Sequence, residues 1–159
     1  MNSKRRVGSK SYPGAALPQH EQCASEPRQA QRLRQALPDL DDWPRSWHVD
    51  PADNVVRQQI VELLAPFLLH RLDQFGAKAT LRRHRDKLWT LGRELIRCRY
   101  DDDELAKKRV QDALRQLTQG DGGPLMWPRS TESEQATLDA NCRKLNRFFR
   151  ESAAAAPSD

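Results

Sequence analysis

The sequence has no long hydrophobic run and no targeting segment. Its most apolar stretch, residues 60–69, is interrupted by Glu62 and Pro66, whereas a membrane span needs roughly 18 predominantly apolar residues. The first ten residues, MNSKRRVGSK, carry basic side chains, but no apolar segment follows them, so they do not form a secretory signal. We therefore expect a cytoplasmic protein without membrane contact.

Cysteine and histidine are few and widely spaced. The three cysteines and four histidines form no CxxC, HxxxH or HExxH motif, so we expect no metal site and no cofactor. Cys23, Cys98 and Cys142 are an odd set, which predicts free thiols in a reducing compartment. Cys98 and Cys142 fall on apolar helical stripes, where a thiol acts as a small hydrophobic group.

Strand patterns and catalytic motifs are also missing. No segment alternates apolar and polar β-branched residues, which is the pattern typical of a strand. The GDGG sequence at 120–123 lacks the Lys and Ser or Thr of a phosphate-binding loop. The acidic run at 101–104 is better explained as a helix cap than as an acid–base pair. We expect an all-α protein that is not an enzyme.

Composition divides the chain into one domain and two tails. A length of 159 residues with 37% apolar and 31% charged residues suffices for a single modest core. Residues 1–46 contain five prolines and little periodicity, which predicts a disordered tail that is basic and rich in proline. Residues 152–159 offer little to bury and are also expected to be disordered. The predicted domain therefore spans residues 47–151.

The first predicted helix of this domain begins at Asp50 and Pro51 and runs to residue 75. An Asp that accepts from free amides, followed by Pro at the first helical position, is typical of a helix start. Pro66 lacks an amide hydrogen, so we expect a kink or a break there. Gly76 is expected to end the helix.

Three further helices complete the predicted bundle of four principal helices. The fourth helix has a capping box, Thr131 with Glu134, at its start. The loop at 119–130 is rich in Gly and Pro, and its apolar residues 125–127 are expected to lie against the core. These helices are expected at residues 77–99, 103–118 and 131–151.

Positive charge is concentrated in the second of these helices. Residues 78–99 hold eight basic residues against Asp86 and Glu94, a net charge of +6 where the whole chain has +5. An amphipathic helix with one buried stripe and a basic remainder is typical of a surface that binds DNA or RNA. The alternative is an ordinary solvated helix face. His84 lies on the apolar stripe, which favours a half-buried packing residue over a functional one.

The basic residues of this helix lie on two flanks of the apolar stripe. One flank has Arg82, Arg93 and Arg97 with Trp89 between them, and Arg83 and Lys87 lie one turn apart on the other. The last helix also keeps basic residues outside its apolar side, at Arg143, Lys144, Arg147 and Arg150.

Three segments resemble a known family. The sequences FLLHRLDQFG, ATLRRHRDKLWTLGRELI and TLDANCRKLNRFFRE are similar to the amino-terminal core-binding domain of phage-integrase-type tyrosine recombinases, a SAM-like four-helix module. The resemblance covers about residues 55–151. It implies that the second and fourth helices face double-stranded DNA through the major groove and its phosphates. The DNA-binding residues that it implies are Arg82, Arg83, Arg85, Lys87, Arg93, Arg97, Arg143, Lys144 and Arg147.

The chain departs from this family in its catalytic part. A tyrosine recombinase also needs a domain with an Arg-His-Arg cluster and a nucleophilic Tyr, but this chain ends eight residues after Glu151 and contains only Tyr12 and Tyr100. We therefore expect a stand-alone DNA-binding module, an accessory or regulatory protein of a mobile element that takes part in DNA recombination, with a recombinase or other protein as a further partner.

Two alternatives remain open. The chain could be a helical protein-interaction module, or an inhibitor, whose basic helices bind an acidic protein partner. Residues 70–92 could also form a helix-turn-helix around Gly76, which would move DNA recognition to the start of the second helix. DNA against RNA, sequence preference and oligomeric state do not follow from the sequence.

Overall fold

Helices form the architecture of the whole described part of the chain, and the prediction of an all-α protein is confirmed. The computed structural model describes residues 19–47, 50–76, 78–120, 122–126 and 129–155, with the backbone alone at 19–26 and 78. These residues contain no strand, and none of their helices is long and apolar enough to cross a membrane. The elements are α1 (Gln19–Ala36), η1 (Leu40–Asp42), α2 (Trp43–Ser46), η2 (Pro51–Asp53), α3 (Asn54–Phe75), α4 (Lys78–Asp101), α5 (Asp103–Lys107), α6 (Val110–Thr118) and α7 (Glu132–Ala155).

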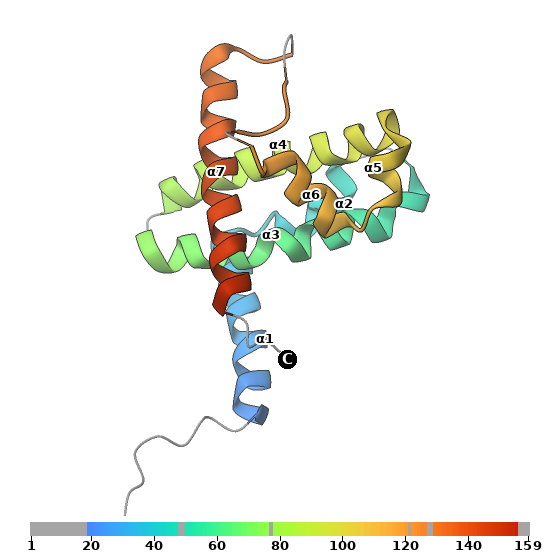
Figure 1. The fold of residues 1–159 in the computed structure, drawn as a ribbon. Helices are drawn as coiled ribbons and strands as arrows, with labels where there is room; N and C mark the ends of the chain where they lie inside the picture. The colour runs from blue at the N-terminus through green and yellow to red at the C-terminus, as the bar shows by residue number, and fades with distance from the viewer. Residues whose placement is uncertain (1–18, 48–49, 77, 121, 127–128, 156–159) are drawn as a thin grey trace, which may run out of the picture.

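The α3 and α4 helices form an antiparallel hairpin at the centre of the molecule (Figure 1). Asp50 accepts a hydrogen bond from the Ala52 amide at 2.9 Å, which caps the entry to η2 and α3 as predicted. The helix α3 continues through Pro66, so the break expected there does not form. It ends at Gly76, which has a φ of +58° and donates its amide to Leu72 O at 2.9 Å.

The long helix α7 crosses the α3–α4 hairpin (Figure 1). Its predicted capping box is confirmed: the Glu134 amide donates to Thr131 Oγ1 at 3.2 Å, and the Thr131 amide donates to Glu134 Oε2 at 2.9 Å. This helix extends to Ala155, so residues 152–155 are helical and are not the disordered tail that was predicted.

The third predicted helix is divided into two, so the prediction of a single helix over 103–118 is wrong. Asp102 caps α5 by accepting from the amides of Glu104 and Leu105, as expected for the acidic run. The backbone becomes extended at Lys108, and α6 begins at Val110. Arg99 of α4 donates to three backbone oxygens here, on Leu105, Ala106 and Lys108, which holds the break in place.

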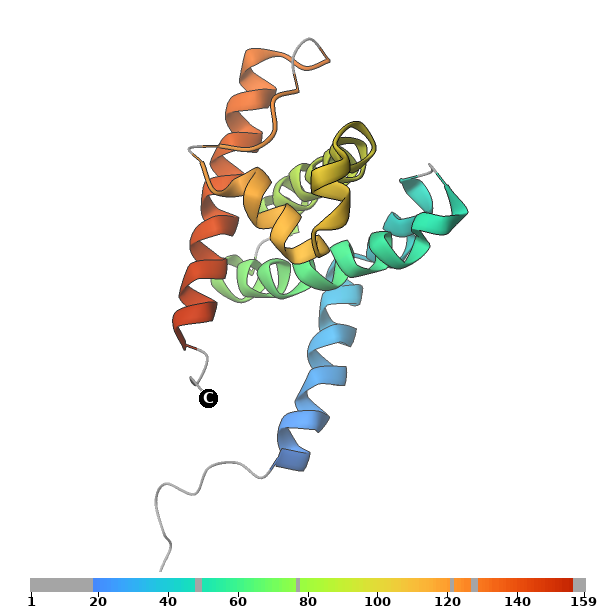
Figure 2. The same ribbon diagram turned by 45° about the vertical axis from the view of Figure 1, so that its right-hand side comes forward.

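The predicted disordered tail at 1–46 needs correction, because described residues within it form part of the core. Four large apolar residues of this segment and Trp47, directly after it, recur every three or four positions and are at most 4% exposed: Leu33, Leu37, Leu40, Trp43 and Trp47. The end of α1 packs on α3, while the rest of α1 extends away from the other helices (Figure 2). The prolines of the segment obscured this helical spacing. Residues 1–18 and 156–159 lie outside the described residues.

Trp47 packs closely against α4 at Gly92. A Cβ added to Gly92 would lie 2.6 Å from Trp47 Cη2, so only glycine allows the indole to approach this far. The Trp47 indole N–H donates to Trp89 O at 3.1 Å, and the Trp89 indole N–H donates to Ser46 Oγ at 2.8 Å. Residues 46–47 are thereby fixed along one flank of α4.

The expectation that residues 125–127 of the loop before α7 lie against the core is correct only in part. Met126 is 8% exposed and packs against the core as predicted, but Leu125 is 72% exposed. A hydrogen bond of the Met126 backbone explains the difference. The Met126 N–H donates to Gln135 Oε1 at 2.8 Å and orients the backbone there. Trp127 lies outside the described residues.

Substitution of two leucines tests how much the N-terminal segment contributes to the free energy of unfolding. Leu37→Ala should lower the free energy of unfolding by about 2–5 kcal/mol, because truncating a fully buried leucine leaves a cavity. The matched change Leu125→Ala should alter it by less than about 0.5 kcal/mol, because that side chain is exposed. Urea unfolding followed by circular dichroism measures both. Equally small effects would show that the N-terminal segment does not pack on the domain.

Substitution of two glycines tests the close approach of Trp47 to α4. Alanine normally stabilises a helix interior by about 1 kcal/mol relative to glycine. At Gly92 the added methyl group would overlap the indole, so Gly92→Ala should instead destabilise the protein by about 1–3 kcal/mol. Gly120→Ala is the control, because a Cβ there meets nothing within 4 Å. A Gly92→Ala variant as stable as the parent in thermal unfolding would refute the contact.

Candidate nucleic-acid interface

A buried hydrogen bond joins α4 to α7 where the two helices cross. His84 is 7% exposed and its Nδ1 contacts Asn141 Oδ1. Because Asn141 Nδ2 donates to Thr137 O at 2.9 Å, Oδ1 is the acceptor and His84 Nδ1 is the donor. Burial lowers the pKa of His84 below its usual value; the hydrogen bond that His84 donates to Asn141 raises it, and the charges of Arg71 and Lys144 lower it further. His84 is thus a packing residue, as predicted.

Basic side chains from three helices surround this crossing. Lys144 of α7 is close enough to influence His84, and Lys87 of α4 influences Glu134 at the start of α7. Arg147 of α7 influences Arg71 of α3. Arg83 lies one helical turn before Lys87 on the same flank of α4. We call Arg71, Arg83, Lys87, Lys144 and Arg147 the crossing cluster.

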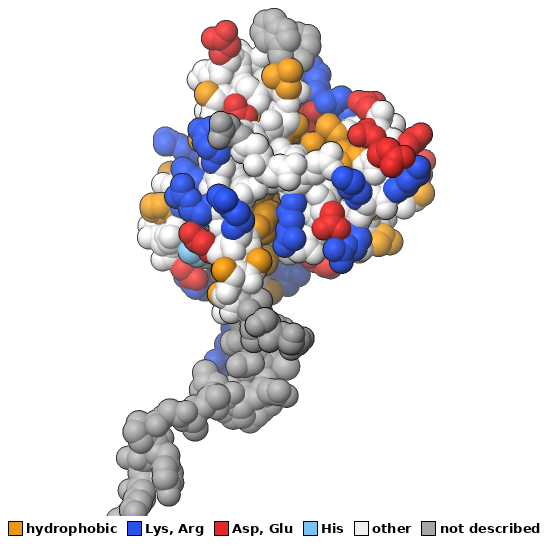
Figure 3. All heavy atoms as spheres, viewed as in Figure 1, with side chains coloured by type: hydrophobic (Ala, Val, Ile, Leu, Met, Phe, Trp, Pro, Cys, Tyr) orange, Lys and Arg blue, Asp and Glu red, His pale blue; other side chains and the backbone are white. Residues whose placement is uncertain are grey.

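The crossing cluster lacks close ion pairs, although Lys87 is near enough to Glu134 to lower the pKa of that carboxyl. Within the part of the chain that the structure describes, none of its five members is in an ion pair. Arg83, Lys144 and Arg147 are exposed, and Lys87 is half-buried. Figure 3 shows Lys and Arg side chains gathered over α7 and the neighbouring ends of α3 and α4. Asp and Glu side chains are visible on the same face in Figure 3, so the cluster is a basic area within a mixed surface.

Arg71 is a member of the cluster that the sequence analysis missed. Its guanidinium lies over the rings of Phe67 and Phe75, with centroid distances of 5.1 and 5.5 Å. Burial lowers the pKa of Arg71, and the nearby charge of Arg147 lowers it further. The signal was present in the sequence, because aromatic residues stand four positions before and four positions after Arg71 on one helix.

Arg85 is held by acidic residues, although the resemblance places it at the DNA. Its guanidinium pairs with Asp86 at 2.8 Å and with Asp39 of the N-terminal segment at 3.3 Å. Burial would lower the pKa of Arg85, but these two carboxylates raise it overall. Asp39 belongs to the segment predicted to be disordered, so this pairing could not be anticipated.

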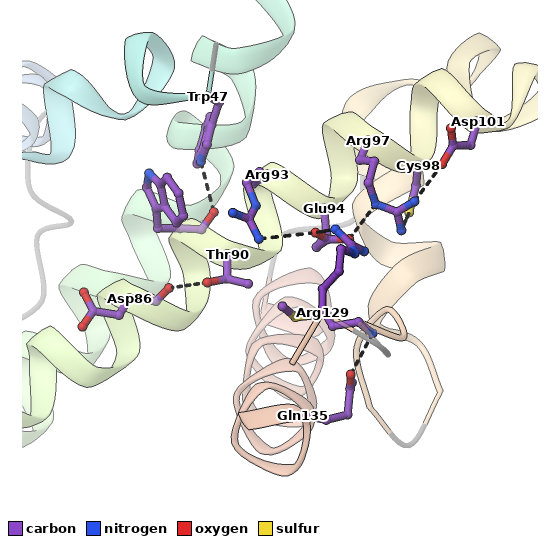
Figure 4. A network of polar contacts seen from close by, with 12 residues as sticks. Trp47, Asp86, Thr90, Arg93, Glu94, Arg97, Cys98, Asp101, Arg129 and Gln135 are labelled. Carbon is purple, nitrogen blue, oxygen red and sulfur yellow. Dashed lines mark hydrogen bonds and ion pairs between the residues drawn. The ribbon is translucent and has the colours of Figure 1, made fainter. Parts of the chain in front are cut away.

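Arg93 and Arg97 surround a buried carboxylate (Figure 4). Glu94 is fully buried and accepts two hydrogen bonds from Arg129, at 2.8 and 2.9 Å, and one from Arg97 Nε at 2.9 Å. Arg93 lies 3.7 Å from the same carboxylate, and Arg97 also pairs with Asp101 at 2.7 Å. Burial would raise the pKa of Glu94, but the hydrogen bonds from Arg129 and Arg97 lower it overall. These arginines compensate an internal charge, so they contribute less free positive charge than their number suggests.

The remaining predicted residues lie at the edges of the crossing. Arg82 is exposed, but it is two positions before His84 and therefore points away from α7, since successive helical residues are 100° apart. Arg143 is exposed on α7 and has further interactions within the chain. Of the nine predicted residues, Lys87, Lys144 and Arg147 each lie near a residue at the crossing, and Arg83 lies one helical turn from Lys87.

The described residues bear on two further kinds of chemistry, metal binding and a tyrosine nucleophile. No group of three or more His, Cys, Asp or Glu among them could hold a metal ion. Tyr100 donates its hydroxyl to Asp53, which together with partial burial raises the pKa of Tyr100 to about 12 and disfavours the phenolate that a nucleophile would require. Tyr12 lies outside the described residues.

Comparison of the chain with models of known protein families, with curated proteins and with solved structures found no match. The resemblance to the core-binding domain of tyrosine recombinases therefore stays a prediction from the quoted sequence segments.

The buried carboxylate gives a pH-dependent prediction. The pKa of Glu94 is lowered on folding, so its contribution to stability is present above its unfolded value of about 4.5 and is lost as the pH falls through the lower folded value. Glu94→Gln should therefore lower the free energy of unfolding at pH 7 by about 1–3 kcal/mol, because it removes a buried group that accepts charged hydrogen bonds. The gap from the parent protein should shrink below pH 4.5.

Urea unfolding at pH 7 and at progressively lower pH measures this gap. Glu132→Gln is the matched control, because Glu132 is exposed and forms no ion pair within the described residues. A Glu94→Gln variant that matches the control at pH 7 would contradict the assigned role of the carboxylate.

Proposed function

We propose that the chain is a module that binds duplex DNA through the crossing cluster. The observation that carries the proposal is the contrast between two sets of cations. The crossing cluster has no acidic partner in an ion pair among the described residues, whereas Arg85, Arg93 and Arg97 on the same α4 helix each lie beside carboxylates.

Physical chemistry links this contrast to a polyanion. Cations without close ion pairs repel one another: burial lowers the pKa of Arg71 most, and the nearby charge of Arg147 lowers it further. DNA phosphates relieve that repulsion, and the release of condensed counterions from DNA adds to the binding free energy. A phosphate backbone is also long enough to contact cations on several helices at once.

The family resemblance supports the same surface. It places the second and fourth helices of the bundle on DNA, and α4 and α7 are in contact with their basic residues at the crossing. We propose on this basis that the protein is an accessory or regulatory component of a mobile element and that it acts on DNA by binding.

A second candidate function is binding of an acidic protein. The observation that favours it is Phe75, which is 52% exposed at the end of α3 beside Arg71. An exposed aromatic ring next to unpaired cations is a feature of protein interfaces, where Arg and aromatic residues are enriched.

Charge reversal at two positions tests the proposed surface. Arg83→Glu with Lys87→Glu should weaken duplex binding roughly tenfold or more and lower the slope of log affinity against log salt by about 2, because two phosphate contacts are lost. Fluorescence anisotropy with a labelled duplex at several salt concentrations measures both values.

The control is Lys107→Glu with Lys108→Glu, which changes the net charge equally. Lys107 pairs with Glu104, and Lys108 donates to Gln116, both away from the crossing. If the two double variants lose equal affinity, only net charge matters and the surface assignment is wrong. An affinity that hardly depends on salt would instead favour the protein partner.

A further inference from the structure

A separate hollow lies beside the buried carboxylate Glu94. Its volume is about 420 Å³, within the range typical of small-molecule sites. The aromatic side chains of Trp47 and Tyr100 and the guanidinium groups of three arginines line it. No residue of the crossing cluster is among its lining residues.

Two aromatic residues at this hollow have fixed positions. Trp47 is only 1% exposed, because it packs closely on Gly92 and donates its indole N–H to Trp89 O, so it closes the hollow from behind and offers a ligand little surface. Tyr100 is 51% exposed, and its hydroxyl donates to Asp53, which fixes the ring. A flat apolar ligand would therefore lie mainly against the Tyr100 ring, and little side-chain entropy would be lost on binding.

More guanidinium groups than carboxylates line the hollow. Arg93, Arg97 and Arg129 line it together with the single carboxylate of Glu94, while Asp101 pairs with Arg97 and Asp53 contacts Tyr100 outside the lining. The three arginine side chains are 41–46% exposed, so each reaches solvent at the hollow. The lining therefore favours an anionic group over a cationic one.

Arg93 is the arginine with the most hydrogen-bonding capacity left. Its shortest contact with Glu94 is 3.7 Å, longer than a hydrogen bond, whereas Arg129 and Arg97 donate to Glu94 at 2.8–2.9 Å. The Arg93 guanidinium lies 5.4 Å from the Trp89 ring centroid, which orients its plane. A guanidinium in this position can donate two parallel hydrogen bonds to a carboxylate.

We propose that this hollow binds a small organic monocarboxylate with a flat apolar body. The carboxylate lies against Arg93, and the apolar body lies against the exposed ring of Tyr100. The site is independent of the DNA-binding surface, and it explains why Arg93 keeps free donors next to a carboxylate that is already satisfied by its neighbours.

Calorimetric titration of the full chain with 3-phenylpropionate tests the proposal. Binding should be saturable, and the neutral analogue 3-phenylpropanamide should bind roughly tenfold more weakly or worse, because it cannot accept charge-assisted hydrogen bonds. Acetate, which lacks the apolar body, should also bind much more weakly. Both comparisons use the unaltered protein, so they do not depend on how a variant folds.

Arg93→Gln should weaken 3-phenylpropionate binding roughly tenfold, with Arg115→Gln as the control on α6. Arg115 is exposed and does not line the hollow. The proposal is overturned if 3-phenylpropionate does not saturate at about 10 mM, if the amide binds equally well, or if a folded Arg93→Gln variant keeps full affinity. Displacement by inorganic phosphate at equal concentration would also overturn it, since the site would then select charge alone.

Discussion

The close packing of Trp47 against Gly92 is the constraint on which the arrangement around α4 depends. It fixes the N-terminal segment along one flank of the helix, and the same segment brings Asp39 to Arg85. That flank is therefore covered, and its positive charge is partly neutralised. The opposite flank, which faces α7, has cations that form no ion pair among the described residues. One close contact thus determines which side of a basic helix presents its charge to solvent.

The buried charge of Glu94 separates a second group of basic residues from the crossing cluster. A fully buried carboxylate lowers the stability of a protein unless charged donors form hydrogen bonds to it. At Glu94 these donors are Arg97 and Arg129. The ion pair between Glu94 and Arg129 also fastens the loop before α7 to α4. The number of basic residues on α4 therefore overstates its free charge, and the position of each one relative to an acid decides its role.

Sequence patterns predicted local features of this fold better than distant contacts. Caps at Asp50, Gly76 and Thr131 have chemical signatures a few residues long, so the helix ends were predictable. The N-terminal part of the core was predictable from apolar spacing but was obscured by prolines. Glu94 and Arg129 are 35 positions apart, and no local pattern relates them. The candidate site could therefore be predicted only as a set of basic residues. Which of them lie beside carboxylates and which form no ion pair could not be predicted.

Lysine modification in the presence of duplex DNA tests the central claim most directly, because it reports which cations the DNA covers. Two lysines, Lys87 and Lys144, belong to the crossing cluster, and two others, Lys107 and Lys108, lie at the break between α5 and α6. Acetylation with and without DNA, followed by mass spectrometry, gives the protection of each. The account predicts that DNA protects Lys87 and Lys144 and leaves Lys107 and Lys108 reactive. Equal protection of all four, or protection of Lys107 and Lys108 alone, would contradict it.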